Sequence, residues 1–248
     1  MSGPLPTSII IPTYNGLHLL ARCLDSIRKF TEVPYEIIVV DNGSTDGTAE
    51  YCERQKVRLI ALPQNEGFPK AANKGLAIAS GEQMLLLNND CVVTPRWLSQ
   101  MLTALHSSEH TGIVGPVTNY ASGRQQIETG LGGIAELLEY AEGHNHSDPA
   151  KWAEVRRLVG LCFLFKRSLY EQIGPLDEGF SPGHYEDDDY CYRAVQRGFR
   201  LLICGDTFIY HQGSVSFRQE HPQGWKELIE RNRRRFIEKW GCEPASAD

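Results

Sequence analysis

Short runs of apolar residues recur four times within the first 90 positions, and a polar or helical stretch follows each one. The runs cover Ser8 to Pro12, Tyr35 to Val40, Val57 to Leu62 and Gln83 to Leu87. Their near-continuous apolar character is typical of strands in a parallel sheet that is covered on both faces. Between the first two runs, Leu20, Leu24 and Ile27 repeat at the spacing of an amphipathic helix. This alternation predicts an α/β fold with right-handed crossovers and an open, doubly wound sheet.

The pattern is less regular after residue 90. It predicts helices over residues 95–107, 187–199 and 224–241, and strands over residues 112–117, 158–165, 200–205 and 207–211. Residues 121–152 are rich in Gly, Glu and His and show no clear period. A loop of that length in a compact domain is usually functional or mobile. Because there is no internal repeat and no obvious linker, we expect a single domain over residues 1–248.

Composition narrows the class of protein. The chain has 248 residues, of which 41% are hydrophobic, and this is enough for one sizeable core. The 25 basic and 31 acidic residues give a formal charge of −6. This charge argues against wholesale nucleic-acid binding, which depends on neutralising phosphates. The triplet Arg233 to Arg235 is a local basic patch. Its ordinary role is a solvated helix face, and contact with a membrane surface or an acidic acceptor is the alternative.

The cysteines and the apolar segments bear on the compartment. The seven cysteines form no C-x-x-C pair and show no metal-ligand spacing, so reduced thiols are expected. No stretch approaches the ~18 uncharged apolar residues of a membrane span. The N-terminal residues lack the basic region and the longer apolar run of a signal peptide. We therefore expect a cytoplasmic protein without a transmembrane segment, for which peripheral membrane contact stays open.

Polar residues follow the predicted strands at the point where each strand ends. The segments are Pro12 to Gly16, Asp41 to Thr48, Pro63 to Gly75 and Asn88 to Asp90. Asn, Asp and Gly also favour turns, so each segment alone has an ordinary explanation. In an open α/β sheet, however, ligands bind beyond the carboxyl ends of the strands. Several such segments on one edge therefore favour a bound polar ligand.

These segments also occur in the order of the motifs of a known family. The motifs are SIIIPTYNG, IIVVDNGSTDGT, NEGFPKAANKGL, LLLNND, GPLDEGFSPGHYEDDDYCYRAVQRG and HQGSVSF. The ordered set, from Ser8 to Phe217, resembles the family 2 glycosyltransferases of GT-A fold. The resemblance implies a Rossmann-like, mostly parallel sheet with helices on both faces. It also implies an enzyme that uses a nucleotide-sugar and a divalent cation, Mn²⁺ or Mg²⁺, and that inverts the anomeric centre.

The resemblance assigns a metal site. Asn88-Asn89-Asp90 occupies the place of the family's D-x-D element, so Asp90 is the expected metal ligand. Asn88 and Asn89 are expected to bond ribose, diphosphate or a metal-bound water. His211 matches a family position that supplies a second metal contact, although a lone His is more often structural. Gly213 and Ser214, which follow His211 closely, are expected to approach the diphosphate.

The same motifs suggest the nucleotide site. The carboxylate of Asp41 can accept a hydrogen bond from the ring N–H of uracil or thymine, and an Asx turn is the alternative. The donor is therefore expected to be a UDP- or dTDP-sugar. The residues predicted to bind it are Pro12, Thr13, Tyr14, Asn15, Asp41, Asn42, Asn65, Gly67, Asn73, Asn88 and Asn89.

Four adjacent carboxylates, Glu186 to Asp189, lie at the start of a predicted helix. Acidic residues in a first helical turn also complement the helix dipole, which is the structural alternative. An inverting transfer requires one base to deprotonate the acceptor hydroxyl. The resemblance points to Asp187 as that base, with Glu186 as the second choice. Asp189 and Arg193 are expected to orient the helix.

These predictions define the expected enzyme and its competitors. Residues 1–90 would bind nucleotide, residues 91–217 would bind the acceptor and carry the base, and residues 223–240 would form a C-terminal helix. The acceptor would be a hydroxyl of a saccharide, a lipid-linked glycan or a protein. A catalytically silent module that binds nucleotide-sugar within a glycan-synthesis complex is the first alternative. A sugar nucleotidyltransferase is the second.

Overall fold

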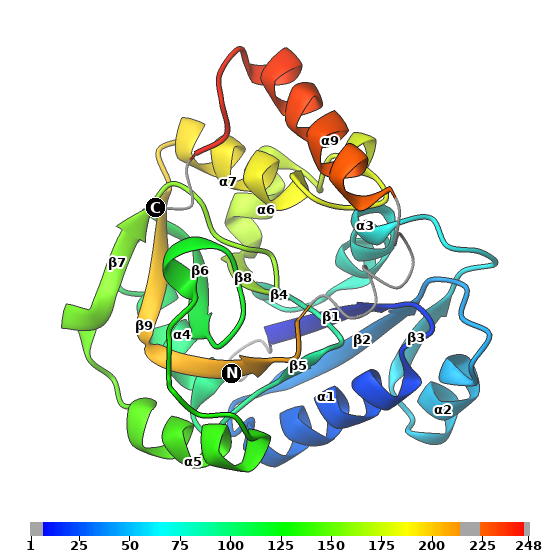
Figure 1. Cartoon of the computed structure of the whole chain (residues 1–248), viewed down its shortest axis with the longest axis vertical. Coiled ribbons are helices and arrows are strands. Elements are labelled where there is room, and N and C mark those ends of the chain that lie inside the picture. Colours follow the sequence, from blue (N-terminus) through cyan, green and yellow to red (C-terminus); the bar gives the residue numbers. More distant parts are fainter. Residues whose placement is uncertain (1–6, 214–223, 246–248) are drawn as a thin grey trace, which may run out of the picture.

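Helices pack on both faces of a β-sheet in the part of the chain that the computed structural model describes, residues 7–213 and 224–245 (Figure 1). The first half alternates strands and helices: β1 (Thr7–Thr13), α1 (Leu17–Phe30), β2 (Tyr35–Asp41), α2 (Thr48–Arg54), β3 (Arg58–Ala61), α3 (Phe68–Ile78) and β4 (Gln83–Leu87). Its strands are parallel and lie in the order β3-β2-β1-β4. The four apolar runs therefore predicted these strands correctly.

The second half continues the sheet with mixed strand directions. Its strands are β5 (Cys91–Val92), β6 (Thr111–Thr118), β7 (Trp152–Val155), β8 (Cys162–Lys166) and β9 (Arg200–His211). Strand β8 runs antiparallel between β4 and β6. Strand β9 is parallel to β6 and antiparallel to β5 and β7. The full order is β3-β2-β1-β4-β8-β6-β9-β5, with β7 beside β9, so the predicted open α/β sheet is confirmed.

In the described part of the second half the helices are α4 (Trp97–Leu105), α5 (Ile134–His144), α6 (Arg167–Ile173), α7 (Glu186–Gln196) and α9 (Trp225–Trp240), with short 3-10 turns at Gly123–Gln125, Pro149–Lys151 and Glu178–Phe180. Helices α4, α7 and α9 match the predicted ones. Strands β5 and β7 and helix α6 are additional, and β9 is one strand of 12 residues where two were expected. None of the helices within the described ranges combines the length and the apolar composition needed to cross a bilayer.

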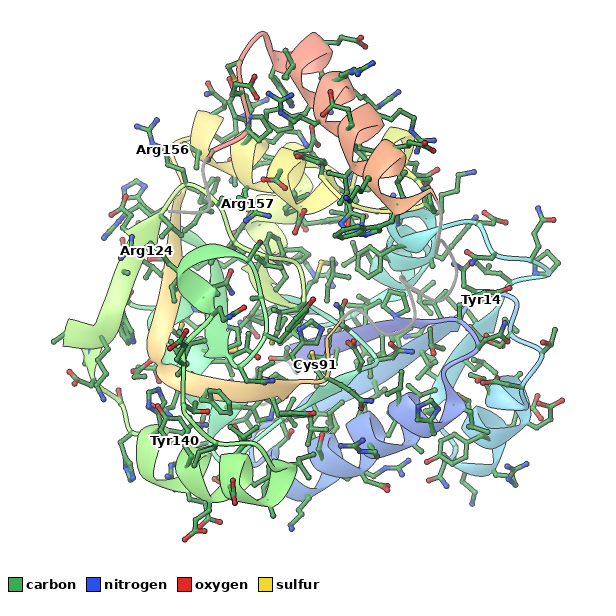
Figure 2. All side chains as sticks on the ribbon, viewed as in Figure 1. Tyr14, Cys91, Arg124, Tyr140, Arg156 and Arg157 are labelled. Carbon is green, nitrogen blue, oxygen red and sulfur yellow. The ribbon has the colours of Figure 1, made fainter. Side chains whose placement is uncertain are left out.

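Helix α5 corrects the expectation that residues 121–152 form one irregular loop. Its buried residues are Leu137 and Ala141 alone, which is too few to give a clear apolar period. Polar contacts fix its end instead, because the side-chain oxygen of Asn145 accepts a 2.7 Å bond from the backbone N–H of Phe208. The ring of Tyr140 stacks on that of His144 with centroids 5.0 Å apart (Figure 2). A helix docked mainly through such groups leaves little trace in the hydrophobic pattern.

Two apolar clusters cover the two faces of the sheet. Successive side chains of a strand point to opposite faces, so Ile9 on β1 packs in a cluster with Leu24 of α1, and Ile10 packs in the other cluster with Ala72 of α3. Gly75 of α3 lies directly on β1, because a Cβ at that position would come within 2.4 Å of Ile10 Cγ2. This close packing from both sides explains why the strands read as continuous apolar runs, and it fixes the strand ends that border the site.

Candidate active site

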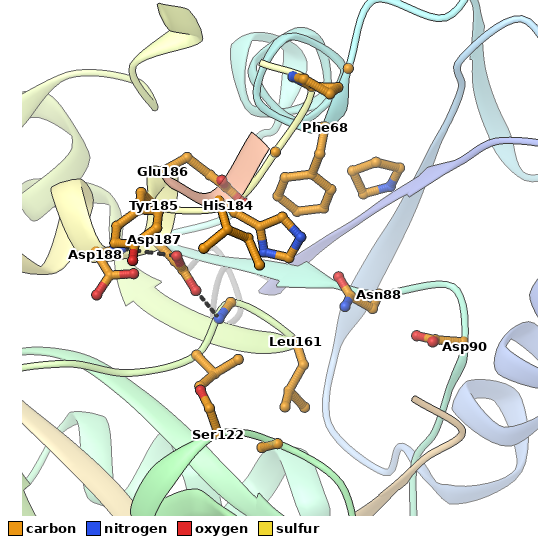
Figure 3. Close-up of a pocket in the computed structure, with 18 of the residues that line it drawn as sticks. Phe68, Asn88, Asp90, Ser122, Leu161, His184, Tyr185, Glu186, Asp187 and Asp188 are labelled. Carbon is orange, nitrogen blue, oxygen red and sulfur yellow. Dashed lines mark hydrogen bonds between the residues drawn. The ribbon is translucent and has the colours of Figure 1, made fainter. Parts of the chain in front are cut away.

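A cavity of about 700 Å³ lies beyond the carboxyl ends of β1 and β4, and the start of α7 and helix α9 line its opposite side (Figure 3). The predicted site residues that line it are Pro12, Thr13, Tyr14, Asn42, Asn65, Gly67, Asn88, Asn89, Asp90, Glu186, Asp187 and His211. Strand ends from the first half of the chain thus share one cavity with the acidic cluster from the second half. Ser214 lies outside the described residues.

Three other residues that were predicted to bind nucleotide do not line this cavity. The side-chain oxygen of Asn15 accepts a 2.8 Å bond from the backbone N–H of Thr45. The carboxylate of Asp41 accepts a bond of 3.1 Å from the N–H of Ser44, which is the turn contact considered as its alternative role. Asn73 bonds the backbone of Leu176 in both directions. Each side chain therefore has a structural partner, and a role in nucleotide binding stays a prediction.

Asp90 and His211 face each other at the cavity wall because β5 pairs Cys91 with His211 of β9. The atoms Asp90 Oδ1 and His211 Nε2 are 3.1 Å apart, and the two side chains are 8% and 7% exposed. His211 Nδ1 lies 2.7 Å from the carbonyl oxygen of Tyr120. A carbonyl only accepts, so Nδ1 carries a proton, and when the ring is neutral its lone pair lies at Nε2.

This pair fits a divalent cation. With a neutral ring, two electron-pair donors face each other, and Nε2 makes no well-aligned hydrogen bond with a described residue, Asp90 included. Burial lowers the pKa of His211, but the adjacent Asp90 carboxylate outweighs this effect and raises that pKa overall. A proton or a cation between the two groups removes the conflict. Mn²⁺ and Mg²⁺ prefer oxygen ligands, so the Asp90 carboxylate would be the main ligand and the imidazole would complement it.

The sulfur of Cys91 is close to this pair but is a poor ligand for such a cation. Ligand atoms of Asp90, Cys91 and His211 lie within 4.8 Å of one another. Burial raises the pKa of the Cys91 thiol well above its usual value, and the thiol contacts the carbonyl oxygen of Leu161 at 3.6 Å. Hard cations prefer oxygen ligands. We therefore regard Cys91 as a core residue that shares the strand with the site.

Amide side chains from the first half line the cavity next to Asp90. The side-chain N–H of Asn89 donates a 2.8 Å bond to Thr13 Oγ1, which ties the end of β4 to the end of β1. Asn42 donates a 2.8 Å bond to Asn65 Oδ1 and so joins the end of β2 to the loop after β3. Gly67 has a φ of +88°, and a Cβ there would lie 2.7 Å from the Cα of Pro182. Glycine at this position lets the loop before α7 approach the nucleotide side.

The start of α7 carries three carboxyl groups on the opposite wall of the cavity, those of Glu186, Asp187 and Asp188 (Figure 3). Asp187 Oδ2 accepts a 2.9 Å bond from the backbone N–H of Gly160, and Oδ1 accepts a 3.0 Å bond from the N–H of Asp188. Two backbone donors thus hold the Asp187 carboxylate at the cavity surface. Each carboxylate oxygen still has a free lone pair for a ligand.

Glu186 and Asp188 are more deeply buried than Asp187. Burial and the neighbouring charge of Asp187 raise the pKa of Glu186 well above its usual value. Glu186 Oε2 has no hydrogen-bond partner among the described residues. Burial and Asp187 also raise the pKa of Asp188 to about 7, although Arg157 opposes this rise through a 2.6 Å ion pair. Both effects on Glu186 favour the protonated form of its carboxyl group.

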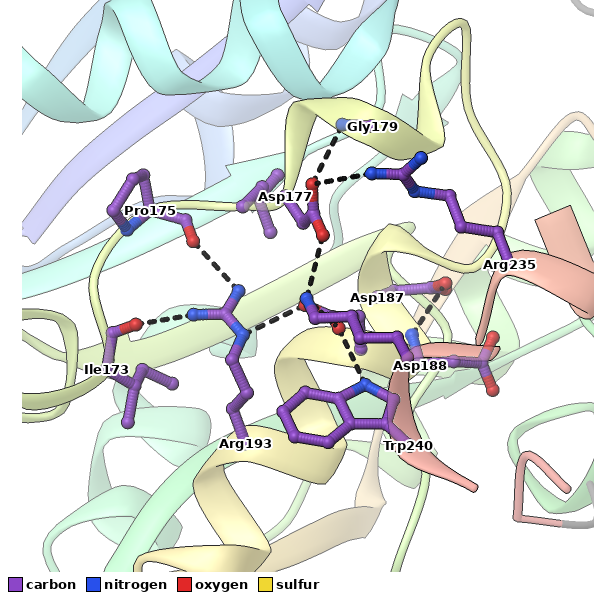
Figure 4. Close-up of polar contacts among 12 residues, drawn as sticks. Ile173, Pro175, Asp177, Gly179, Asp187, Asp188, Arg193, Arg235 and Trp240 are labelled. Atoms are coloured by element: carbon purple, nitrogen blue, oxygen red, sulfur yellow. Dashed lines mark hydrogen bonds and ion pairs between the residues drawn. The ribbon is translucent and has the colours of Figure 1, made fainter. Parts of the chain in front are cut away.

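Helix α9 fixes the start of α7 from outside the cavity (Figure 4). The buried carboxylate of Asp189 accepts bonds from Arg193 Nε at 2.9 Å, Lys239 Nζ at 2.6 Å and Trp240 Nε1 at 2.9 Å. Lys239 also contacts Asp177, which lies 3.8 Å from Arg235. Asp189 and Arg193 therefore form an i,i+4 pair away from the cavity, in agreement with their expected structural role.

A second tether holds the loop that precedes α7. The buried side-chain amide of Asn232 on α9 donates to the carbonyl oxygens of Phe180, Gly183 and His184 at 2.8, 2.8 and 3.0 Å. His184 and Tyr185 have φ angles of +71° and +73°, an uncommon backbone conformation for residues with side chains. The bonds from Asn232 hold the first of these residues directly, and the loop leads into Glu186.

Several cavity residues had no signal in the sequence pattern. Arg157 and Gly160 come from the connection between β7 and β8, Ser122 follows β6, and Trp225 begins α9. None of these four residues belongs to a motif that predicted a site, and only the long-range contacts bring them to the cavity. Of residues 121–152, only Ala121 and Ser122 line the cavity, so a role of this segment as a lid stays a prediction.

Comparison with known proteins gives relatives that are similar over most of this chain. One is an uncharacterized protein of Sinorhizobium fredii, 31% identical over 87% of this chain. This match spans a quarter (25%) of the length of that relative. Another is a glycosyltransferase, GlyG, of Streptococcus pneumoniae, 29% identical over 90% of this chain and 77% of the relative.

A solved structure has the same fold. It is a mannosyltransferase from Pyrobaculum calidifontis in complex with GDP-Man and Mn²⁺, with a TM-score of 0.66 and 21% sequence identity. The match covers 94% of this chain and 65% of the mannosyltransferase chain. The sequence profile described as Glycosyl transferase family 2 matches residues 8–174, which is more than half of the chain. The chain therefore belongs to glycosyl transferase family 2 and is a glycosyltransferase of GT-A fold.

Proposed function

We propose that this glycosyltransferase is metal-dependent and inverting, and that it moves a sugar from a nucleotide-sugar to a hydroxyl of its acceptor. The observation that carries the proposal is the pairing of two different walls in one cavity. One wall carries Asp90 and His211, which suit a cation, and the opposite wall carries Asp187, which suits a base. A cavity built this way has room for a donor and an acceptor together.

The donor would lie along the strand ends of the first half. Asp90 and His211 would hold the cation, whose charge would offset the negative charge that develops on the nucleoside diphosphate as it leaves. Asn88 and Asn89 would hydrogen-bond the ribose or the diphosphate. A UDP- or dTDP-sugar is our proposal because the ring N–H of either base suits a carboxylate such as that of Asp41. The mannosyltransferase of the same fold binds GDP-Man, so guanosine donors belong in any test.

The acceptor hydroxyl would be activated at the start of α7. Its oxygen attacks the anomeric carbon from the face opposite the diphosphate, the glycosidic bond to the diphosphate breaks, and the hydroxyl proton passes to Asp187. Glu186 is the weaker candidate, because its raised pKa favours the protonated carboxyl group, which cannot accept a proton. The two backbone bonds to Asp187 support this role, since they aim the carboxylate without burying it.

The wider proposal concerns the acceptor and the setting of the enzyme. The acceptor would be a saccharide, a lipid-linked glycan or a protein hydroxyl. The chain would form one domain, with a nucleotide half, an acceptor half and the C-terminal helix α9. A cytoplasmic location is in keeping with seven cysteines that are all free thiols.

Thermal shift and donor turnover test this proposal. UDP, dTDP and GDP, each with and without its sugar and Mn²⁺, should produce a selective stabilisation that depends on the cation, because a ligand that binds only the folded state raises its stability. Turnover of the selected donor should release the nucleoside diphosphate and give a product of inverted configuration. Binding without turnover would support the silent module, and release of pyrophosphate would support the nucleotidyltransferase. Retained configuration would contradict the inverting mechanism.

A further inference from the structure

A second, smaller recess opens beside the active cavity on its acceptor side. Its volume is about 330 Å³, and three arginines line it: Arg124, Arg156 and Arg157. Figure 2 shows these arginines on the same side of the molecule as β7. Ser122, Arg157, Val159 and Ala245 line both the recess and the active cavity. A ligand in the active cavity could therefore extend into the recess.

Two of these arginines have no acidic partner. Arg124 and Arg156 are exposed, and neither makes an ion pair with any residue of the ranges 7–213 and 224–245. The recess also contains Glu154, but its carboxylate already pairs with Arg200 at 2.8 Å. Guanidinium groups in one recess repel one another, and a bound anion would relieve that repulsion.

Most of the basic residues of α9, in contrast to Arg124 and Arg156, are paired with acidic residues. Arg233 and Arg234 pair with Glu230, and Arg233 also pairs with Glu243 at 2.6 Å. Arg235 and Lys239 contact Asp177. The arginine-rich stripe of the sequence is thus largely neutralised by its neighbours, so it is a weak candidate for binding an anion. In a protein of net charge −6, the recess stands out as a place where positive charge is left uncompensated.

Arg157 connects the recess to the catalytic wall. Its Nε contacts Asp188 Oδ1 at 2.6 Å, and its NH1 donates a 3.0 Å bond to Ser122 Oγ. Asp188 follows Asp187 directly, so the recess begins next to the proposed base. An acceptor whose hydroxyl reaches Asp187 would carry its other end toward Arg124 and Arg156.

We propose that this recess binds a phosphate or diphosphate group of the acceptor, and that Arg124 and Arg156 select anionic acceptors over neutral ones. The inference rests on the proposed transfer to a hydroxyl acceptor and adds the acceptor's chemical class. Guanidinium groups bind phosphate oxygens through paired, charge-assisted hydrogen bonds, which suits a cluster of arginines better than a cluster of lysines. The phosphate could belong to a glycan on a lipid diphosphate or to a phosphodiester polymer.

Binding of inorganic pyrophosphate tests the recess without any turnover. Calorimetry is run in EDTA, so that no divalent cation recruits pyrophosphate to the donor side. The double variant Arg124→Gln with Arg156→Gln should bind at least about 10-fold more weakly than wild type, since it loses charge-assisted hydrogen bonds to the anion. Arg54→Gln with Arg197→Gln removes the same charge from exposed arginines that line neither cavity, and it should bind as wild type does. Equal binding by all three proteins would overturn the proposal.

Transfer assays test the role of the recess in acceptor choice. Short alkyl glycosyl diphosphates are compared with neutral alkyl glycosides of the same sugars, and a glycerol phosphate oligomer represents the phosphodiester source. The phosphate-bearing acceptor should have the lower KM in wild type, and the Arg124→Gln with Arg156→Gln variant should lose that preference. Arg124→Lys with Arg156→Lys should keep part of it. The better of the two anionic acceptors identifies the source of the phosphate.

Hydrolysis of the donor by water separates the two proposals. It should be the same in wild type and in the glutamine variant, because the recess lies away from Asp90 and His211. If the donor turns over but neutral and anionic acceptors are used equally, the recess proposal is wrong and the proposed function stands. If no donor turns over while pyrophosphate binding still depends on the arginines, the proposed function is wrong and the recess remains an anion site without the acceptor role.

Discussion

The ends of β1, β2 and β4 are held by short bonds within the first half of the chain, whereas the start of α7 is held by residues from distant segments. Asn89 bonds Thr13, and Asn42 bonds Asn65, so the nucleotide side is braced by its own strand ends. Asp187 depends on Gly160, and Asp189 depends on Lys239 of α9. The side chains of the two walls therefore depend mainly on different contacts, although the backbone N–H of Phe68 donates a 2.7 Å bond to Pro182 between them. Donor binding and sugar transfer should accordingly respond to different mutations.

The largest expected effect comes from the proposed base. Asp187→Asn keeps the shape of the side chain but removes its basicity, so transfer should fall by about 10²–10⁴-fold, the usual contribution of general-base catalysis. Donor affinity should stay near wild type. Steady-state rates with a working donor and acceptor measure the effect, and Glu186→Gln is the matched neighbour, expected to cost less. If Glu186→Gln were inactive while Asp187→Asn kept the wild-type rate, the base would be Glu186 and not Asp187.

The tether between α9 and α7 should matter for stability. Asp189→Asn removes the buried carboxylate that three donors share, and losing one partner of a buried ion pair costs about 3–5 kcal/mol. Lys239 is partly exposed and keeps Asp177, so we expect the lower end of that range. Urea unfolding measures it. Glu230→Gln, which breaks exposed pairs on the same helix, should change stability by less than about 1 kcal/mol. Similar losses in both variants would contradict the buried role of Asp189.

Donor binding gives a second readout of the same variant. If the two walls are independent, folded Asp189→Asn protein should bind nucleoside diphosphate normally while its transfer rate falls. Asp189→Glu keeps the charge but shifts the position of the carboxylate. If this variant also loses transfer and stability, the position of the carboxylate matters as well as its charge. A loss of nucleotide affinity that matches the loss of transfer would mean that α9 supports both walls.

The acidic cluster should make stability fall as pH rises. The folded-state pKa of Asp188 is raised from 3.8 to about 7, and that of Glu186 is raised well above 4.5. These two groups therefore bind more protons in the folded protein than in the unfolded chain above about pH 4, so their contribution to stability decreases from there toward pH 7 and beyond. Glu186→Gln removes one of these groups and should flatten the decline. Unfolding free energies at pH 5 and pH 8 measure the slope, and an unchanged slope would show that Glu186 is not desolvated in solution.

The smallest expected effect is the protection of the segment between β6 and α5 from proteolysis when a ligand binds. Residues 128–133 are mostly exposed, while Ala121 and Ser122 at the start of the segment line the cavity. A nucleoside diphosphate with Mn²⁺ should slow cleavage there by a few-fold, because loops beside active sites often order when substrates bind. Limited proteolysis followed by mass spectrometry of the fragments tests this. Equal cleavage with and without ligand would contradict the prediction that this segment is a lid, and α5 would then have a structural role only.

The same contrast explains how much could be predicted from the sequence. In the first half, each strand is a local apolar run and each strand end carries its own Asn or Asp, so the pattern predicted both β4 and Asp90. In the second half, β5 has two residues and α5 buries two side chains, and signals this short do not stand out. Arg157 is a single charged residue in its own segment, and its partner Asp188 lies 31 residues further along the sequence. Sequence spacing alone could not predict that contact, whereas the resemblance pointed to Asp187 through a contiguous motif.

A polar residue near the end of a strand does not necessarily line the cavity, as three residues show: Asn15, Asp41 and Asn73. Each of these side chains bonds backbone instead of lining the cavity. Asp41 makes a local turn contact with Ser44, as Asp often does. Asn15 and Asn73 bond backbone 30 and 103 residues away in the sequence. The choice between these roles depends on which way a side chain points, and composition does not encode that direction. Their substitution by Ala would show whether any of them contributes to donor affinity.

The most direct test of the independent walls is calorimetry of the nucleoside diphosphate selected in the thermal-shift panel, with and without Mn²⁺, on three proteins. Wild type and Asp187→Asn should show the same Mn²⁺-dependent affinity, because the base lies on the acceptor wall. Asp90→Ala should remain folded and lose the Mn²⁺ dependence, because it removes the carboxylate that faces His211 across 3.1 Å. Mn²⁺-dependent binding that survives in Asp90→Ala, or disappears in Asp187→Asn, would contradict the division of the cavity into a donor wall and an acceptor wall.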